Sequence, residues 1–311
     1  MSNQENDAIK QGNLLRDKGD LDGAIAAYTE SISLDAQNAE AYCGRACAYG
    51  KKGEFDRAIT DFAEAIRLAP EPSRVYCNRA YLYFGKGCLD EAIADYTEAI
   101  RLNPEYAEAC CNRGCIYDDK GDRDKAIADF TEAIRLNPKS FRAFRERATT
   151  YRKKGDHNKA IADYTEAIRL NPEDAVAYYG RGYSYLEKGD HDKAIADYTE
   201  SIRLNQEYAA VYNARGYSYA VKGDHARAIA DFTEAIHLDP KRVDAYYNRG
   251  CAYSEKGDHA KAIADYTEVI QLDPQNGHAF YARGYSYWKK GDKAKAKADF
   301  AQAKKLVRKP T

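Results

Sequence analysis

The sequence predicts an all-α fold, a right-handed α-solenoid (superhelix) built from nine helix-turn-helix units. Three observations support this: one glycine recurs every 34 residues without insertion, an alanine and an aromatic residue follow it in fixed register, and proline recurs near the end of most units. A constant period of this length is typical of repeat proteins in which each unit packs on its neighbours. The glycines stand at 19, 53, 87, 121, 155, 189, 223, 257 and 291.

The period divides the chain into a short N-terminal segment and nine units. We expect residues 1–4 to be disordered and residues 5–310 to form a single solenoid domain. Each turn glycine has an apolar-periodic stretch on either side, which predicts two helices per unit. The units are 5–38, 39–72, 73–106, 107–140, 141–174, 175–208, 209–242, 243–276 and 277–310.

The second helix of each unit is predicted to pack by placing a small residue beside a large one. Alanine recurs at 24, 58, 92, 126, 160, 194, 228, 262 and 296, and an aromatic residue recurs at 28, 62, 96, 130, 164, 198, 232, 266 and 300. This alternation allows close helix packing and fills the remaining space. Proline at 70, 104, 138, 172, 240 and 274 is expected to stop the helix, with Ala36 and Gln206 as exceptions.

The first helix of each unit has an aromatic face of its own. Tyr42 and Tyr49, with their equivalents, are seven residues apart, so they lie on one face, which we expect to be core. An arginine also recurs, and we expect its stem to cover apolar neighbours while its guanidinium binds a carboxylate of the Asp61, Asp95, Asp129 series. These arginines are at 45, 79, 113, 147, 181, 215, 249 and 283.

The last unit differs from the others in a way that predicts the end of the stack. Eight units carry isoleucine at two positions seven residues apart, beginning with Ile25 and Ile32, whereas the ninth carries Lys297 and Lys304. A terminal helix has no successor to cover it, so its outer face must be solvated. We therefore expect a monomer rather than end-to-end association.

Composition argues against several classes of partner. The 48 basic and 49 acidic residues give a formal net charge of -1, so there is no basic field to attract nucleic acid or anionic lipid. No apolar run is long enough to span a bilayer and no signal peptide is present, which favours the cytoplasm. The eight cysteines are expected to be reduced.

No pattern of catalytic or cofactor-binding residues emerges. A phosphate-binding glycine loop, a nucleophile elbow and a zinc-protease motif are all lacking. The recurring histidines at 157, 191, 225 and 259 and the cysteine pairs Cys43/Cys47 and Cys111/Cys115 are separated by whole units, too far apart for the four converging ligands of a structural metal site. We expect no enzyme activity, no cofactor and no metal.

The period, glycine, alanine, aromatic residue and proline together resemble the tetratricopeptide repeat (TPR) family over residues 5–310. Pentatricopeptide repeats, which bind RNA, have a period of about 35 and basic surfaces, so they fit less well. The resemblance implies an interaction scaffold with a concave groove lined by the second, fifth, sixth, ninth, twelfth and thirteenth residues of each unit.

These groove positions vary along the chain and define the candidate binding residues. The early units present a small, polar wall, the fifth unit is basic, and units six to nine present aromatic residues suited to anchoring a peptide. The candidates are Asn78, Asn112, Arg142, Arg145, Arg152, Tyr179, Tyr183, Asn213, Tyr217, Tyr247, Asn248, Tyr281, Tyr285 and Trp288. We expect an acidic stretch of a partner protein to meet the fifth unit and apolar side chains to meet units seven to nine.

Two subtypes of the family have characteristic residues at these positions. The set that clamps a C-terminal carboxylate is incomplete, because Asn13 matches but Ile9 and Gly44 replace a lysine and an asparagine. A partial asparagine ladder resembles the repeats fused to a sugar transferase. The leading hypothesis is thus a non-catalytic adaptor that binds a peptide or helix. The alternatives are a regulatory or substrate-recruiting subunit of an enzyme on another chain, such as a sugar transferase, and a repeat protein without a specific partner.

Overall fold

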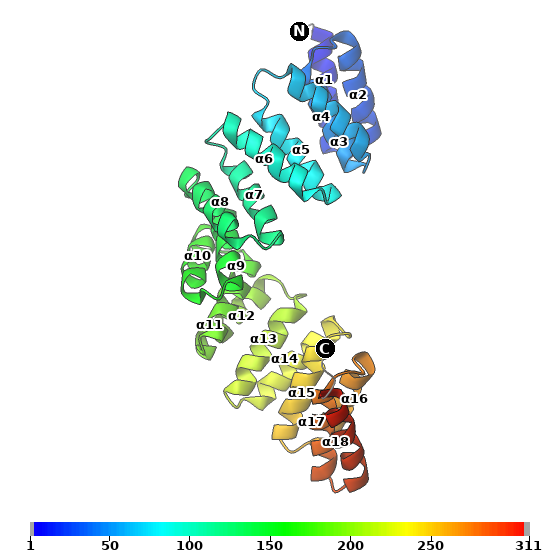
Figure 1. The fold of residues 1–311 in the computed structure, drawn as a ribbon, viewed down its shortest axis with the longest axis vertical. Helices are drawn as coiled ribbons and strands as arrows, with labels where there is room; N and C mark the ends of the chain where they lie inside the picture. The colour runs from blue at the N-terminus through cyan, green and yellow to red at the C-terminus, as the bar shows by residue number, and fades with distance from the viewer. Residues whose placement is uncertain (1–2, 308–311) are drawn as a thin grey trace. The chain divides into compact units, whose positions relative to one another are not determined.

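The computed structural model describes residues 3–307, which form eighteen α-helices and no strands (Figure 1). The chain divides into two compact units, Met1–Thr150 and Tyr151–Thr311, which are described separately. The helices of the first unit are α1 (Asn3–Asp17), α2 (Leu21–Leu34), α3 (Ala39–Lys51), α4 (Phe55–Leu68), α5 (Ser73–Lys86), α6 (Leu89–Leu102), α7 (Ala107–Asp119) and α8 (Arg123–Leu136).

The remaining helices begin with α9 (Phe141–Lys153), which contains the boundary between the two units. Those of the second unit are α10 (His157–Leu170), α11 (Ala175–Glu187), α12 (His191–Leu204), α13 (Ala209–Val221), α14 (His225–Leu238), α15 (Val243–Glu255), α16 (His259–Leu272), α17 (Gly277–Lys289) and α18 (Lys293–Val307). The helices form regular pairs, two per 34-residue repeat, as the sequence predicts. The odd-numbered helices are therefore the first helices of the repeats, and the even-numbered ones are the second.

The ends of the chain differ slightly from the expectation. Helix α1 begins at Asn3, although the sequence predicted disorder up to residue 4. Residues 1–2 of the predicted disordered segment and residues 308–310 of the ninth repeat lie outside the described residues. That residues 5–310 make one domain remains a prediction.

The turn between the two helices of a repeat requires glycine. All nine turn glycines have a left-handed backbone, with φ between 77° at Gly189 and 85° at Gly291, a conformation that costs other residues energy. In most repeats an aspartate follows and caps the second helix: Asp156, for example, accepts a hydrogen bond from the backbone N–H of Lys159. Glu54 and Cys88, at the equivalent positions of the second and third repeats, make no such cap.

The core consists of the predicted pairs of small and large residues. Tyr28 and Tyr198 are fully buried, and the aromatic residues of the other repeats up to Tyr266 are almost as inaccessible. The first helix contributes a small residue against each ring: a Cβ atom added to Gly114 would lie 2.9 Å from Cε1 of Phe130. A side chain at that glycine would therefore force the two helices apart.

The recurrent arginine joins three helices. Arg113 in α7 donates two hydrogen bonds to the buried carboxylate of Asp129 in α8, at 2.8 and 2.7 Å, and a third to Thr97 of α6 in the preceding repeat, at 3.0 Å. The prediction of a guanidinium bound to the aspartate series is confirmed. The threonine contact was not foreseen, and it makes the arginine a bond between neighbouring repeats.

The aromatic face of the first helices is only half-buried, rather than core as predicted. The guanidinium of Arg79 lies 5.5 Å from the ring centre of Tyr76 and 5.8 Å from that of Tyr83. The two rings therefore flank the arginine, and cation–π contact replaces apolar burial on their exposed sides.

The second helices end without needing proline. In seven repeats the residue after the last leucine accepts a hydrogen bond from the backbone N–H two residues later, which forms an Asx turn. The acceptors are Asp35, Asn103, Asn137, Asn171, Asn205, Asp239 and Asp273. Helices α2 and α12, which Ala36 and Gln206 follow, end at the same place as the others. Helix α4 differs, because the residue after it, Ala69, has no side chain that could accept a hydrogen bond; Pro70 comes next.

Candidate partner-binding surfaces

The exposed large apolar residues concentrate on the first helices. Twelve such side chains are exposed in the described part of the chain. Eight of them lie at the varied groove positions: Tyr81, Phe84, Val176, Tyr217, Val221, Tyr281, Tyr285 and Trp288. The second helices expose only Leu34, Leu102 and Leu272, each at a helix end. One face of the repeats thus carries apolar surface that nothing in the described chain covers.

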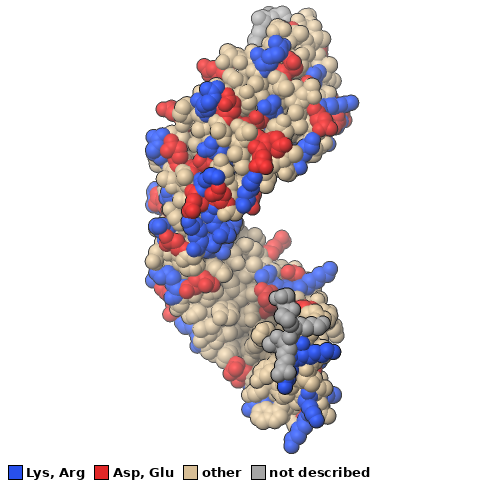
Figure 2. All heavy atoms as spheres, viewed as in Figure 1, with Lys and Arg blue, Asp and Glu red and all other residues tan. Residues whose placement is uncertain are grey.

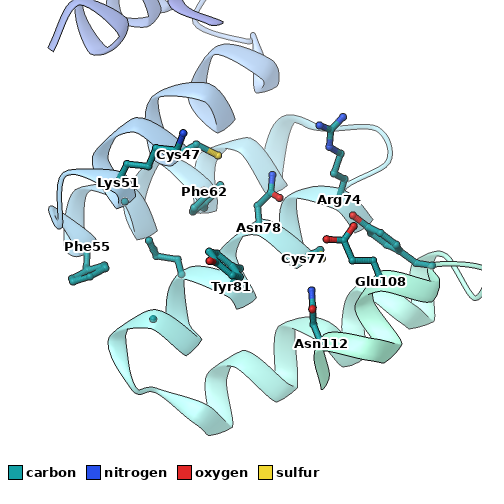
Figure 3. Close-up of a pocket in the computed structure, with 14 residues that line it drawn as sticks. Cys47, Lys51, Phe55, Phe62, Arg74, Cys77, Asn78, Tyr81, Glu108 and Asn112 are labelled. Carbon is teal, nitrogen blue, oxygen red and sulfur yellow. The ribbon is translucent and has the colours of Figure 1, made fainter. Parts of the chain in front are cut away.

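A pocket of about 680 Å³ opens on this face of the first unit. Figure 3 shows side chains from three successive first helices around it: Cys47 from α3, Cys77, Asn78 and Tyr81 from α5, and Asn112 from α7. Its lining also includes the apolar side chains of Phe62 and Leu82 and the exposed, charged side chains of Lys51, Arg74 and Glu108. The pocket has the size and mixed lining of a small ligand or side-chain site.

The predicted residues Asn78 and Asn112 are half-buried in this pocket and are partly engaged. The side chain of Asn78 donates to Sγ of Cys43 at 3.5 Å, and Asn112 shares a hydrogen bond with the hydroxyl of buried Tyr96. Both amides retain further hydrogen-bonding capacity for a ligand.

Cysteine thiols line the same face in two pairs. A hydrogen bond from the Cys47 thiol lowers the pKa of Cys43 to about 7, and the same contact raises the pKa of Cys47. The hydrogen bond between Cys111 and Cys115 likewise lowers the pKa of Cys111. By contrast, burial raises the pKa of Cys77 to about 11. All eight cysteines are free thiols.

The basic residues predicted for the fifth repeat all lie on α9 but have different partners. Arg145 is half-buried and paired with Glu146 at 2.8 Å, whereas exposed Arg142 lies 3.9 Å from Sγ of Cys115. Arg152 places its guanidinium 5.0 Å from the ring centre of Tyr183. Figure 2 shows Lys and Arg side chains gathered near the middle of the chain, where Figure 1 draws α9. The first two arginines belong to the first unit and Arg152 to the second.

The aromatic residues predicted for the second unit differ in availability. Tyr217, Tyr281, Tyr285 and Trp288 are exposed, and the rings of Tyr285 and Trp288 lie 5.9 Å apart on α17. Figure 2 shows a surface with few charged side chains over α11 and α13 in this unit.

The other predicted tyrosines of the second unit are half-buried. Tyr179 packs against Tyr198 and Tyr208, Tyr183 lies under Arg152, and Tyr247 packs against Tyr266. These tyrosines support the exposed residues more than they offer surface of their own.

The predicted asparagines of the second unit form a short chain of hydrogen bonds. Asn248 donates to the side-chain oxygen of Asn213 at 3.2 Å, and Asn213 donates to Asp244 at 3.0 Å. A hollow of about 520 Å³ lies beside them, lined by Tyr247 and His278 among others. These groups run from α13 to α15, so the polar strip crosses two repeats.

Sequence reasoning missed one groove position, the residue just before each first helix. Tyr106 lines the pocket of the first unit, the ring of Tyr208 lies tilted against that of Tyr179 with 5.1 Å between their centres, and Arg242 pairs with Asp244 at 3.0 Å. The signal was present, because this position varies from repeat to repeat as much as the predicted ones do.

Clusters of metal ligands and membrane-spanning helices are both absent from residues 3–307. Among residues 3–307 no three His, Cys, Asp or Glu side chains are grouped closely enough to hold a metal ion together. In the same part of the chain, none of the helices has the length and apolarity to cross a membrane.

The four recurring histidines are the first residues of α10, α12, α14 and α16. In each of them the Nδ1 atom is buried and lacks a hydrogen-bond partner among the described atoms.

Comparison with known proteins identifies the repeat. Models described as tetratricopeptide repeats match residues 39–72, 73–106, 107–140, 243–276, 179–243 and 277–309, and a model described as a TPR repeat matches 12–53 and 148–189. No curated protein matches the chain.

Solved structures with similar folds include a crystal structure of MamA, which is 26% identical over 53% of this chain and 91% of its own, with a TM-score of 0.51. YrrB, a TPR protein with an unusual peptide-binding site, is 23% identical over 60% of this chain and 97% of its own, with a TM-score of 0.54. The C-terminal part of a TPR repeat-containing protein from Cytophaga hutchinsonii is 20% identical over 76% and 97%, with a TM-score of 0.61. The last two show a shared fold.

Proposed function

Because this chain belongs to the tetratricopeptide repeat family, we propose that it is a non-catalytic scaffold that binds a segment of a partner protein on its first helices. The TPR fold is generally an interaction scaffold rather than an enzyme. The observation that carries the proposal is the concentration of eight of the twelve exposed large apolar side chains on the groove positions of the first helices.

The chemistry of the surface favours a particular kind of segment. Exposed Tyr217, Tyr285 and Trp288 combine rigid apolar area with a polar edge, and such residues carry much of the binding energy at protein interfaces. In the same unit Arg152 has its Nε atom buried without a hydrogen-bond partner among the described atoms, while its guanidinium lies over Tyr183. A segment with aromatic or aliphatic side chains and an acidic residue fits both features.

Selection from a displayed peptide library with the whole chain tests this proposal. We expect enrichment of peptides that combine aromatic or aliphatic residues with an acidic one. Replacing Tyr217 or Tyr285 with alanine should weaken a selected peptide about tenfold, since loss of such an anchor costs about 1.4 kcal/mol or more. The matched control is Leu272→Ala, which removes an exposed apolar residue from a second helix.

The charge requirement is tested separately. Arg152→Glu should weaken peptides that contain an acidic residue and leave neutral variants of the same peptides unaffected. Arg169→Glu on α10 makes the same change of charge on a second helix and serves as the control. Equal losses for first-helix and second-helix variants, or no enrichment at all, would contradict binding on the first helices.

A further inference from the structure

Two pairs of cysteines on the first helices have no role in the proposed binding of a peptide. Cys43 and Cys47 lie one turn apart on one face of α3, and Cys111 and Cys115 occupy the same two repeat positions on α7. In each pair the spacing of four residues places the two side chains next to each other on the surface of the helix. The sulfur atoms of a pair are therefore neighbours that face the same space.

Each pair also receives a hydrogen-bond donor from the first helix of the next repeat. The amide of Asn78 in α5 lies 3.5 Å from Sγ of Cys43, and the guanidinium of Arg142 in α9 lies 3.9 Å from Sγ of Cys115. Donors and positive charge stabilise a thiolate over a thiol, and the thiolate is the form that binds metals. Both pairs thus have a donor from the next repeat, an amide on the first cysteine of one pair and a guanidinium on the second cysteine of the other.

We propose that each cysteine pair binds one soft monovalent cation of the cuprous type between its two sulfur atoms. Thiolates are the ligands that cuprous ion prefers, and two of them satisfy it. On binding, the two thiols release two protons and form two metal–sulfur bonds, so the site gains one net negative charge, which the neighbouring donors offset. This proposal does not depend on peptide binding.

The arrangement also explains which metals are disfavoured. Zinc takes four ligands in structural sites, whereas residues 3–307 bring no three ligating side chains together. A cation that takes only two sulfur ligands finds both of them in a single cysteine pair. Cys47 lines the open pocket of the first unit, so an ion can reach the first pair from solvent (Figure 3).

The chain contains matched solitary thiols at the same two repeat positions. Cys77 stands where Cys43 and Cys111 stand, but Tyr81 replaces the second cysteine. Cys251 stands where Cys47 and Cys115 stand, but Tyr247 replaces the first. These two cysteines test whether a pair is needed or whether any thiol on this face is enough.

The experiment is an anaerobic titration of the reduced, full-length protein with cuprous ion against a competing cuprous chelator. We expect two ions per chain, accompanied by sulfur-to-copper charge-transfer absorption. The double variants C43S/C47S and C111S/C115S should each lose one ion, and the variant with all four serines should lose both. The variants C77S and C251S should still bind two.

Several results would overturn the proposal. These are binding of less than one ion per chain in the presence of the chelator, a loss of copper in C77S or C251S equal to that in the paired variants, or zinc retained as firmly as copper. Because Cys111 is buried, the helical content of each variant is measured by circular dichroism. If a variant unfolds, X-ray absorption of the wild-type complex decides: two sulfurs per copper support the site, and three or four contradict it.

Discussion

At the scale of single residues, the arginine that recurs in the second to ninth repeats joins more elements than most other charged side chains do. In Arg181 the guanidinium donates two hydrogen bonds to Asp197, at 2.8 and 2.7 Å, and one to Thr165, at 3.1 Å. Asp197 is only 6% exposed, so without the arginine its carboxylate would be a buried negative charge with no positive partner to compensate it.

Replacing Arg181 with alanine should lower the free energy of unfolding by about 3 kcal/mol, because an uncompensated buried carboxylate costs this much. Urea denaturation followed by circular dichroism measures the change. The control is Arg169→Ala, which breaks an exposed pair with Glu166 and should leave the free energy of unfolding almost unchanged. Similar losses of unfolding free energy in the two variants would show that the buried pair contributes no more to stability than the exposed pair does.

Two buried tyrosines should respond in opposite ways to the same substitution. The hydroxyl of Tyr28 donates to Asn13 at 2.7 Å, whereas the buried hydroxyl of Tyr198 has no hydrogen-bond partner among the described atoms. Tyr28→Phe should therefore destabilise the protein by about 1 kcal/mol, and Tyr198→Phe should be neutral or stabilising. Phe62 and Phe232 already occupy the equivalent positions, so phenylalanine fits there. Thermal unfolding of both variants under identical conditions tests the difference in sign.

The buried tyrosines also predict a loss of stability in alkali. Burial raises the pKa of Tyr28 to about 12 and raises that of Tyr96 as well. An unfolded tyrosine loses its proton near pH 10, so between pH 10 and 12 the unfolded state binds fewer protons than the folded one, and stability falls as pH rises. The melting temperature should drop across this range, and it should drop less in Tyr28→Phe/Tyr96→Phe. An equal drop in both proteins would assign the effect to other groups.

At the scale of helices, the junction between the second and third repeats lacks features that the others have. Seven of the eight junctions have the arginine–threonine hydrogen bond, but Arg79 faces Ala63, where a threonine would be expected. Ala69 makes no Asx turn after α4, and Glu54 and Cys88 make no cap for α4 and α6. We expect α4 and α5 to separate more readily than other neighbours.

Hydrogen exchange of the backbone amides tests this expectation. Amides in α4 and α5 should exchange faster than their equivalents in the second unit, because the free energy of local opening depends on the bonds between neighbours. Ala63→Thr should slow their exchange by supplying the hydroxyl that Arg79 lacks. Uniform protection along the chain, or no response to this substitution, would show that the missing bond has no effect.

At the scale of the whole chain, the fold follows from local rules that a sequence displays. The small residue at the position of Gly114, the aromatic residue at the position of Phe130 and the turn glycines recur with one period, and each has a single steric explanation. The helices and this part of the core could therefore be predicted, whereas the aromatic face of the first helices was wrongly expected to be core. The contacts of Thr97 and Tyr106 could not, because they join residues of different repeats through side-chain conformation rather than pattern. For the same reason, which groove tyrosines would be exposed and which would support them became visible only in the structure.

The last repeat gives a prediction at this scale. Lys297 and Lys304 are exposed on α18, where the other repeats carry half-buried isoleucine against the next repeat. Restoring isoleucine at both positions creates an apolar face that resembles an internal one. The variant should form dimers or larger species at rising concentration, measured by light scattering after size-exclusion chromatography. A double variant to glutamine keeps the face polar and should stay monomeric.

The side-chain hydrogen bonds described among residues 3–307 join residues that lie close together along the sequence. The longest described ones, from Asn78 to Cys43 and from Asn248 to Asn213, span 35 residues, scarcely more than one period. None of these described bonds joins repeats that are not neighbours, so the gain or loss of one complete period leaves the bonds between the other neighbouring repeats in place. Such a gene can change length by recombination between its own copies, and the reach of the protein can evolve separately from the residues on its surface.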